Sequence, residues 1–207
     1  SRLEVGFSSK STDRGDTQVA EIFNESTNSF VLDSEFSNEF IYNETVHAAY
    51  LQYGGSIGFF GINAGGRYET VDMLSELKTT NETFKNPYSS FYPSLSVTFG
   101  APQLLQIQTS YSKRVNRPRS RMLNPFSSRQ DSKNLRVGNP FLKPEYTDSY
   151  EINFSRFSRG LSLSLGGYYR HTTDKMQRHK EMRADGVSVA TYANITDQKS
   201  QGIDYSV

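Results

Sequence analysis

The sequence predicts an all-β fold, an antiparallel up-and-down meander of about eight strands. Apolar and polar residues alternate with a period of two in many segments, and none has the 3.6-residue period of a convincing amphipathic helix. The 207 residues include 13 Tyr and 14 Phe, which argues against a disordered chain, and tyrosine favours strands. Cysteine is absent, which excludes disulfides, thiolate nucleophiles and Cys-bound metals.

The alternation is clearest in residues 94–99, 105–112 and 161–169. In each segment one face carries mainly Leu, Ile, Val or aromatic residues, and the other carries mainly Ser, Thr, Gln or Gly. For residues 39–53 the sequence indicates an extended segment but does not assign its faces. Strands are expected near residues 2–9, 39–53, 58–70, 91–99, 103–114, 146–156, 160–173 and 201–207.

The connections between these strands alternate in length. Short turns are expected at residues 54–57, 100–102 and 157–159. Long loops are expected at about 10–38, 71–90, 115–145 and 174–200. In a meander this order puts every tight turn at one end of the sheet and every long loop at the other, as in outer-membrane β-barrels.

We therefore interpret the sheet as part of a transmembrane β-barrel wall with one face toward lipid. Leu163 is expected on that face near the middle of the bilayer. Polar residues on the other face are expected to face a watery lumen: Arg67, Glu69, Gln106 and Gln108. A β-sandwich also alternates, because it buries one face of each sheet, and it remains an alternative.

The sequence offers no sign of catalysis. It contains no P-loop and no Gly-x-Ser-x-Gly elbow, and its three His residues lack metal-site spacing. We therefore expect no enzyme, no catalytic residue, no cofactor and no metal. Lys and Arg number 23 against 22 Asp and Glu, and a net charge of +1 argues against a nucleic-acid partner.

The most distinctive region comprises RVNRPRSRMLNPF at 114–126 and VGNPFLKPEYTDSYE at 137–151. Its four prolines fix φ and cannot donate to a ladder, so the region cannot be a central strand throughout. We expect a stiff loop whose ends resume strands near 114 and 146.

Both segments resemble the TonB-dependent receptor barrels of the outer-membrane β-barrel family in Bacteroidetes-type bacteria, where such motifs flank an extracellular loop. The resemblance covers nearly the whole chain in order, and further matches lie at 40–44, 48–53, 64–69, 194–195 and 202–204. It implies location in the outer membrane of a Gram-negative bacterium. It also implies uptake of a scarce ligand, such as a siderophore, vitamin or glycan, energised through TonB.

The implied partners are outer-membrane lipid, a plug domain and the TonB system of the parent protein, and a small-molecule or oligosaccharide ligand. Family members carry a plug and about twenty-two strands. We therefore expect residues 1–207 to be one partial barrel domain without a plug, which self-associates in isolation. A passive porin or structural barrel, and a secreted glycan-binding β-sandwich, are the alternative functions.

The candidate site is the signature loop and the mouth around it. Its residues are Arg114, Arg117, Pro118, Asn124, Pro125, Phe126, Gly138, Asn139, Pro140, Lys143, Pro144, Glu145 and Glu151. Glu145 and Glu151 are candidates to pair with Arg114, Arg117 or Arg121. We interpret this network as a brace for the loop base, with direct ligand contact as the alternative. The loop is basic and includes Arg119, Arg121 and Arg136. Such a loop is expected either as a charged rim at the level of the lipopolysaccharide or as a surface that attracts an anionic ligand.

Overall fold

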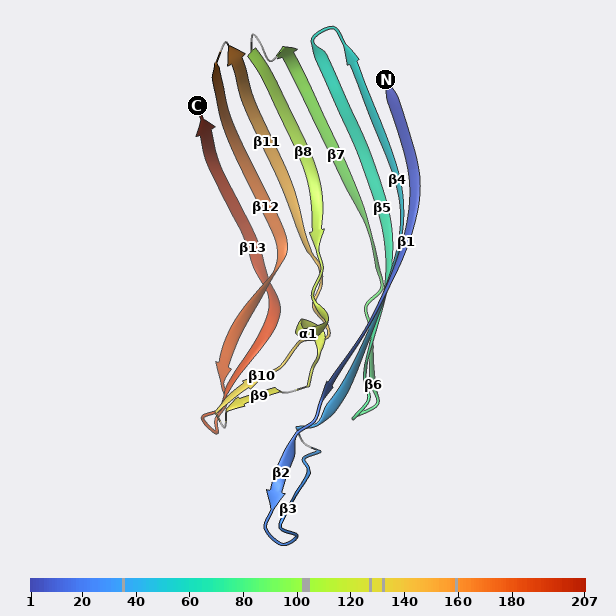
Figure 1. Cartoon of the computed structure of the whole chain (residues 1–207), viewed down its shortest axis with the longest axis vertical. Helices are drawn as coiled ribbons and strands as arrows, with labels where there is room; N and C mark the ends of the chain where they lie inside the picture. The colour runs from blue at the N-terminus through green and yellow to red at the C-terminus, as the bar shows by residue number, and fades with distance from the viewer. Residues whose placement is uncertain (35, 102–104, 127, 132, 159) are drawn as a thin grey trace.

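The computed structural model describes residues 1–34, 36–101, 105–126, 128–131, 133–158 and 160–207. In this part of the chain, eight long strands form one antiparallel sheet in chain order (Figure 1). They are β1 (Arg2–Gln18), β4 (Asn38–Ile57), β5 (Phe60–Leu77), β7 (Tyr88–Ala101), β8 (Leu105–Asn116), β11 (Glu145–Ser158), β12 (Leu161–Met182) and β13 (Ser188–Ser206). The predicted up-and-down meander is confirmed.

Short elements lie at the end of the sheet where the long connections are. β2 (Glu21–Asn24) and β3 (Ser29–Leu32) form a separate hairpin, and β6 (Glu82–Lys85) extends the sheet beside β5. β9 (Ser128–Asp131) pairs with β10 (Asn134–Arg136), which pairs in parallel with the start of β13. The sequence predicts no helix, but a single helical turn, α1 (Ser120–Leu123), lies between β8 and β11.

Among the described residues, no helix has the length and apolar character to cross a bilayer.

The strands are longer than predicted. β1 continues to Gln18 and β13 already begins at Ser188, although long loops were expected over 10–38 and 174–200. Residues 8–18 of β1 and 196–201 of β13 are polar on both faces, so the alternation that marks a half-buried strand disappears there while the ladder continues. The long connection that is largely irregular is 117–144, between β8 and β11.

The turn predicted at 54–57 is wrong. Gly54 and Gly55 belong to β4, and the chain reverses at Gly58 and Phe59, where Gly58 has φ of +58°. A Cβ on Gly54 would lie 2.7 Å from the Asn63 Oδ1 atom, so this glycine makes room for a side chain across the ladder. The predicted turns at 100–102 and 157–159 include residues 102 and 159, which lie outside the described residues.

The register gives the sheet one apolar and one polar face. On the apolar face Phe99 lies opposite both Phe60 and Ile107, and these rows continue across the sheet through Leu165. Leu51 and Tyr53 lie opposite Val5 and Leu3, which assigns the odd-numbered residues of 39–53 to this face. Its side chains are exposed, with Leu3 at 65% and Leu165 at 50%. In the described chain no second sheet covers them, as the β-sandwich alternative would require.

Aromatic side chains edge the apolar face toward the loop end of the sheet. The rings of Tyr111 and Tyr150 are 5.0 Å apart and those of Tyr150 and Tyr169 are 6.3 Å apart. The next residues on this face toward the loops are Lys113 and His171, which are polar. Tyrosines at such a boundary suit the interface between hydrocarbon and headgroups.

The sheet divides between β7 and β8 near the loop end. The β7–β8 ladder ends at the pair Ser94 and Ser112, although β7 begins at Tyr88 and β8 continues to Asn116. The next residue of β7, Pro93, has no N–H to donate. Figure 1 shows the two strands moving apart below this point. We call the region between residues 88–93 and 113–116 the seam.

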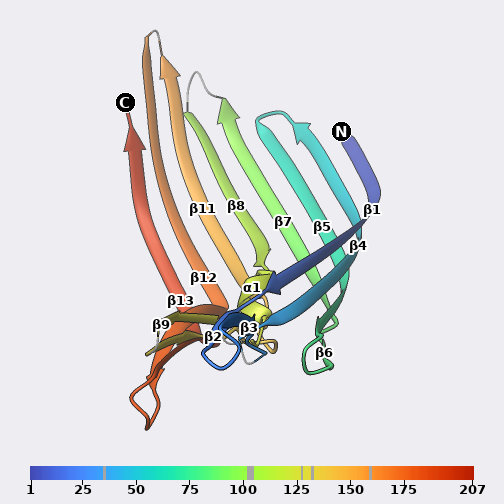
Figure 2. The ribbon, with the colours of Figure 1, turned by 60° about the horizontal axis from the view of Figure 1, so that its bottom comes forward.

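The buried core lies on the polar face at the loop end. Phe40 and Leu77, from β4 and β5, pack against Leu123 of α1 and Leu142 of the loop. Tyr192 of β13, from the far side of the sheet, contacts the same cluster. Because strands from both sides of the sheet converge on the loop, the loop lies within the curve of the sheet (Figure 2).

Candidate functional site

The loop of residues 117–144 crosses the polar face of the sheet at its loop end. Leu123 and Leu142 anchor it, since they are 1% and 2% exposed against β4 and β5. Pro118, Pro140 and Pro144 are also buried, so the stiff loop predicted from the prolines is a packed part of the fold.

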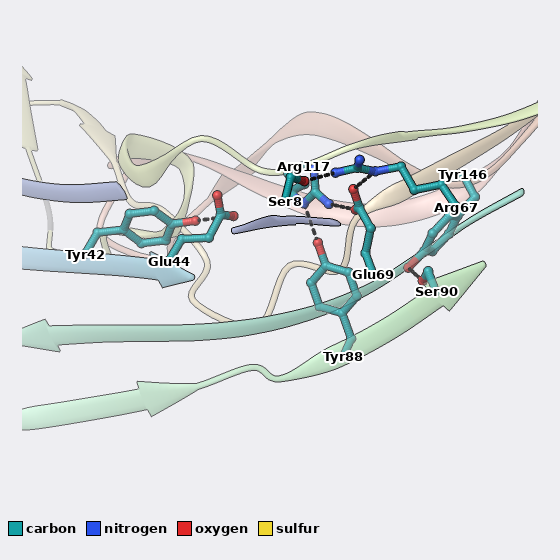
Figure 3. A network of polar contacts seen from close by, with 9 residues as sticks. All are labelled: Ser8, Tyr42, Glu44, Arg67, Glu69, Tyr88, Ser90, Arg117 and Tyr146. Carbon is teal, nitrogen blue, oxygen red and sulfur yellow. Dashed lines mark hydrogen bonds and ion pairs between the residues drawn. The ribbon is translucent and has the colours of Figure 1, made fainter. Parts of the chain in front are cut away.

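The carboxylate of Glu69 is the centre of a charge network beneath this loop (Figure 3). Arg117, directly after β8, donates from one terminal guanidinium nitrogen to Glu69 Oε2. Arg67 donates from Nε to Glu69 Oε1 at 2.6 Å and reaches Ser8 Oγ at 3.3 Å. The Glu69 side chain is 7% exposed, and two guanidinium groups offset the cost of burying its charge.

Arg117 also joins the network to β7. Its Nε donates to the hydroxyl of Tyr88 at 2.8 Å. Burial raises the pKa of Tyr88 to about 12, although the neighbouring Arg117 lowers it. Burial alone lowers the pKa of Arg117, but Tyr88 and Glu69 raise it above the ordinary value, so the guanidinium stays charged. The seam between β7 and β8 is therefore bridged by a charged side chain rather than by a ladder.

A second bridge crosses the seam through Tyr146 of β11. Its hydroxyl is 2.7 Å from Ser90 Oγ on β7, and its ring stacks on Tyr92 at 6.5 Å. The Lys113 ammonium lies 5.4 Å from the centre of the Tyr146 ring. Side chains from both sides therefore fill the gap that the backbone leaves open.

The Asn and Gly residues of the signature hold the two halves of the loop together. The N–H of Gly138 donates to Asn124 O at 2.8 Å, and the N–H of Asn139 donates to Met122 O at 2.7 Å. A Cβ at position 138 would collide with the carbonyl oxygens of Asn124 and Met122, which explains the glycine. Asn124 Oδ1 also accepts from the N–H of Phe126 at 3.0 Å, closing a tight turn around Pro125.

Further amides tie the loop to both sides of the sheet. Asn139 Nδ2 donates to Tyr192 O on β13 at 3.1 Å, and Asn86 Nδ2, beyond β6, donates to Pro140 O. Asn194 of β13 accepts from the N–H of Lys143 at 2.9 Å and donates to Lys143 O at 3.0 Å. Lys143 therefore stabilises the loop through its backbone N–H and carbonyl groups.

Glu145 ends the loop as a buried carboxylate, 4% exposed. It accepts from the N–H of Met176 at 2.7 Å and from Asn116 Nδ2 at 2.9 Å, and Lys175 Nζ lies 3.5 Å away. These partners fix the start of β11 against β8 and against the irregularity in β12.

The predicted pairings of the loop charges are wrong in detail. Glu151 pairs with Arg170 at 3.2 Å, and Glu145 pairs with Lys175, whereas Arg117 pairs with Glu69. Arg114 lies exposed on the polar face opposite Thr147. Among the described residues no ion pair joins Glu145 or Glu151 to Arg114, Arg117 or Arg121. The sheet curvature, which no local pattern reports, brings residues 48 positions apart together at Arg117 and Glu69.

Gln106 and Gln108 share a face with Arg67 and Glu69, as the register across β5, β7 and β8 shows. Gln108 Nε2 donates to Ser96 Oγ at 3.1 Å. That this face lines a lumen remains a prediction.

Two hollows flank the loop. One, of about 450 Å³, adjoins the seam and is lined mainly by apolar groups such as Tyr88, Phe141 and Leu142. The other, of about 320 Å³, lies between the loop and the end of β1 and is more polar. Among the described residues there is no cluster of three or more acidic or His side chains that could bind a metal ion.

Sequence reasoning missed several residues of the site. Tyr88, Asn86 and Lys175 lie in segments expected to be loops, and Ser8 lies at the end of a predicted strand. Each contributes through a partner far away in sequence, and no local signal could have identified it.

A curved antiparallel sheet with an exposed apolar face, an aromatic edge and a polar inner face defines a class of protein, the transmembrane β-barrel of the outer membrane. The chain matches the outer membrane protein beta-barrel family over residues 1–207 and belongs to it. Its location is the outer membrane of a Gram-negative bacterium. No curated protein sequence matches the chain.

Solved structures share the fold at low sequence identity. The Serratia marcescens hemophore receptor HasR, with its hemophore HasA and heme, aligns with a TM-score of 0.66 and 13% identity over 98% of this chain and 38% of its own. The copper transporter OprC aligns with a TM-score of 0.66 and 12% identity over 98% of this chain and 32% of its own. The unliganded ferric citrate transporter FecA aligns with a TM-score of 0.61 and 13% identity over 98% of this chain and 28% of its own. The chain thus spans about a third of each and shares the fold of their barrels.

Proposed function

We propose that this chain forms part of the barrel wall of a TonB-dependent receptor that takes up a scarce ligand across the outer membrane. The apolar face contacts lipid, and closure with further strands satisfies the free backbone groups of the outer edges of β1 and β13. Arg67, Glu69, Gln106 and Gln108 face the lumen. A plug domain and the TonB system are the partners, and a small molecule or oligosaccharide is the ligand.

The observation that carries the proposal is the loop fastened across the polar face. A porin keeps a water-filled channel. Here Leu123 and Leu142 bury themselves against the inner side of the wall, and Arg117 and Asn139 tie the loop to opposite sides of the sheet. Such a mouth suits a gated receptor better than an open pore.

Two kinds of evidence support transport by a receptor. The solved structures with this fold are described as a hemophore receptor, a copper transporter and a ferric citrate transporter. The polar face carries charged side chains suited to holding a plug, such as the Glu151–Arg170 pair, whose guanidinium also lies 4.5 Å from the centre of the Tyr168 ring.

The test is growth and uptake in the native host. The gene is deleted, and the strain is grown with iron, copper, a vitamin or a glycan limiting, one at a time. We expect a defect with one nutrient, and uptake of that nutrient that stops when TonB is removed although binding at the cell surface remains. Uptake that continues without TonB would contradict the proposal.

The passive porin alternative makes the opposite prediction in planar bilayers. A porin conducts ions steadily as purified, whereas a receptor closed by its loop and plug does not. Steady conductance of the purified protein would favour the porin.

A further inference from the structure

The more polar hollow brings together two arginines that the charge network does not use. Arg121 is in the last turn of α1 and Arg136 ends β10, yet both line the hollow of about 320 Å³ beside the end of β1. The polar and aromatic residues around them are Asp16, Gln18, Asn124, Phe126 and Tyr192.

The charges in this hollow are unbalanced. Among the described residues neither Arg121 nor Arg136 has a carboxylate within ion-pair distance, whereas Arg117 and Arg67 share Glu69. Asp16 is the one acidic residue of the described lining, so the hollow has a formal charge of +1. Unpaired guanidinium groups favour carboxylate and phosphate groups, which they bind through two parallel hydrogen bonds.

The backbone positions of both arginines are fixed by packing and hydrogen bonds. α1 is held by buried Leu123, and the N–H of Met122 donates to Arg119 O at 2.8 Å. β10 pairs with β13, and the N–H of Val137, the next residue, donates to Ala190 O at 3.0 Å. The two guanidinium groups therefore start from rigid elements, which limits the entropy lost on binding.

We propose that this hollow recognises a carboxylate or phosphate group of the transported ligand through Arg121 and Arg136, an inference that rests on the receptor function proposed above. The amides of Gln18 and Asn124 bind polar groups beside the anion, and Asp16 accepts from a hydroxyl or ammonium group there. The rings of Phe126 and Tyr192 contact the less polar part of the ligand.

The test is calorimetric titration of the full-length protein, purified from outer membranes in detergent, with tricarballylate and, separately, with inorganic phosphate. We expect one of them to bind, and the tighter probe identifies the oxyanion. Arg121→Gln and Arg136→Gln should each weaken binding at least tenfold, and the double variant should abolish it. Asp16→Asn should tighten binding of either probe, because a repelling carboxylate is removed.

Arg119→Gln is the matched control, since Arg119 is an exposed arginine of the same loop that does not line the hollow. It should bind like the wild type. Circular dichroism and heat-dependent gel migration confirm that each variant is folded, and Arg→Lys changes at 121 and 136 should restore part of the affinity. Absence of binding by the wild type, or equal affinity in all folded variants, would overturn the proposal.

The same variants separate this inference from the proposed function. If TonB-dependent uptake is unchanged in the Arg121→Gln/Arg136→Gln double variant, the proposed receptor function is supported and the proposed anion site is contradicted. Binding that depends on both arginines, in a protein with no TonB-dependent uptake, would support the site as an anion site and contradict the receptor.

Discussion

Arg117 and Glu69 form an ion pair between the loop and the inner side of the wall, across a seam where the β-ladder is interrupted. Through Tyr88 and Arg67 the same pair reaches β7 and, by way of Ser8, β1. The loop across the polar face and the interrupted ladder are therefore one structural feature, because the side chains that bridge the seam also hold the loop.

Glu69→Gln is expected to loosen the loop. Arg117 would keep a hydrogen-bonding partner but lose its counter-charge while three quarters of its side chain stays buried. We expect a loss of about 1.5–3 kcal/mol in the free energy of unfolding, the range for hydrogen bonds to charged groups. Urea unfolding in detergent measures it, and trypsin should cut the loop faster.

Glu4→Gln is the control for this change. Glu4 pairs with Arg2 at 2.5 Å, and the two side chains are 38% and 82% exposed. An exposed pair contributes at most about 1 kcal/mol, so the stability should hardly change. Equal effects of the two substitutions would show that the Arg117–Glu69 pair does not hold the loop.

The attachment of the loop to β7 should weaken at alkaline pH because Tyr88, which lies beyond the apolar face, loses its proton there. Its pKa is about 12 in the folded chain and 10.0 in the unfolded chain. A folded pKa above the unfolded one means that the contribution is complete below pH 10 and is lost as the pH rises toward 12. Tyr88→Phe should remove this part of the pH dependence, as measured by the unfolding midpoint at each pH. Superimposable wild-type and variant profiles above pH 10 would refute it.

Asn194→Ala should free the Lys143 segment from β13. The amide of Asn194 exchanges two hydrogen bonds with the Lys143 backbone and donates a third to Asp174 O at 2.7 Å. Leaving these groups unpaired should cost about 1–3 kcal/mol each where they are buried, although part of this site is exposed. Hydrogen exchange at the Lys143 amide should accelerate. Asn153→Ala, an exposed position on the polar face, should leave that exchange unchanged.

The 207-residue chain alone should self-associate in water. Leu3, Val5 and Phe7 of β1 are 65–73% exposed, and Ile203 and Tyr205 of β13 are each 80% exposed. Apolar edge strands with free backbone groups pair with other chains. Sedimentation without detergent should show large species, and mild detergent should disperse them. A monodisperse monomer in plain buffer would argue against the lipid-facing assignment.

The sequence predicted the meander and its two faces because alternation is a local pattern that the pleat makes visible, as in residues 161–169. It also located the signature loop, since Pro118 and Pro140 constrain the backbone locally. It did not predict the partners of Glu145 or Arg117, because these depend on how the sheet curves. Nor did it predict the full length of β1, whose end is polar on both faces, or of β13, in which residues 196–201 are polar on both faces.

The depth of a residue along a strand is another property on which the register of the sheet bears. Leu163 was expected near the bilayer middle, but it lies opposite Arg156, an exposed residue of the same apolar face near the short turn. An arginine on that face belongs at an interface, where it reaches the headgroups. Leu165 lies between this level and Tyr169, opposite Phe154 and Tyr205, and we therefore predict that it lies nearer the midplane than Leu163.

Leu165→Arg should therefore hinder insertion by about 2–4 kcal/mol, and Leu163→Arg by less, because it lies nearer to the interface. Ser164→Arg, the residue between them, points to the polar face, where Ser164 Oγ is 2.7 Å from Ser206 Oγ. Its arginine remains hydrated, so insertion should proceed as in the wild type. The measurement is folding into lipid vesicles as a function of urea, read from gel migration. If Leu165→Arg and Ser164→Arg insert equally well, the apolar stripe does not face hydrocarbon.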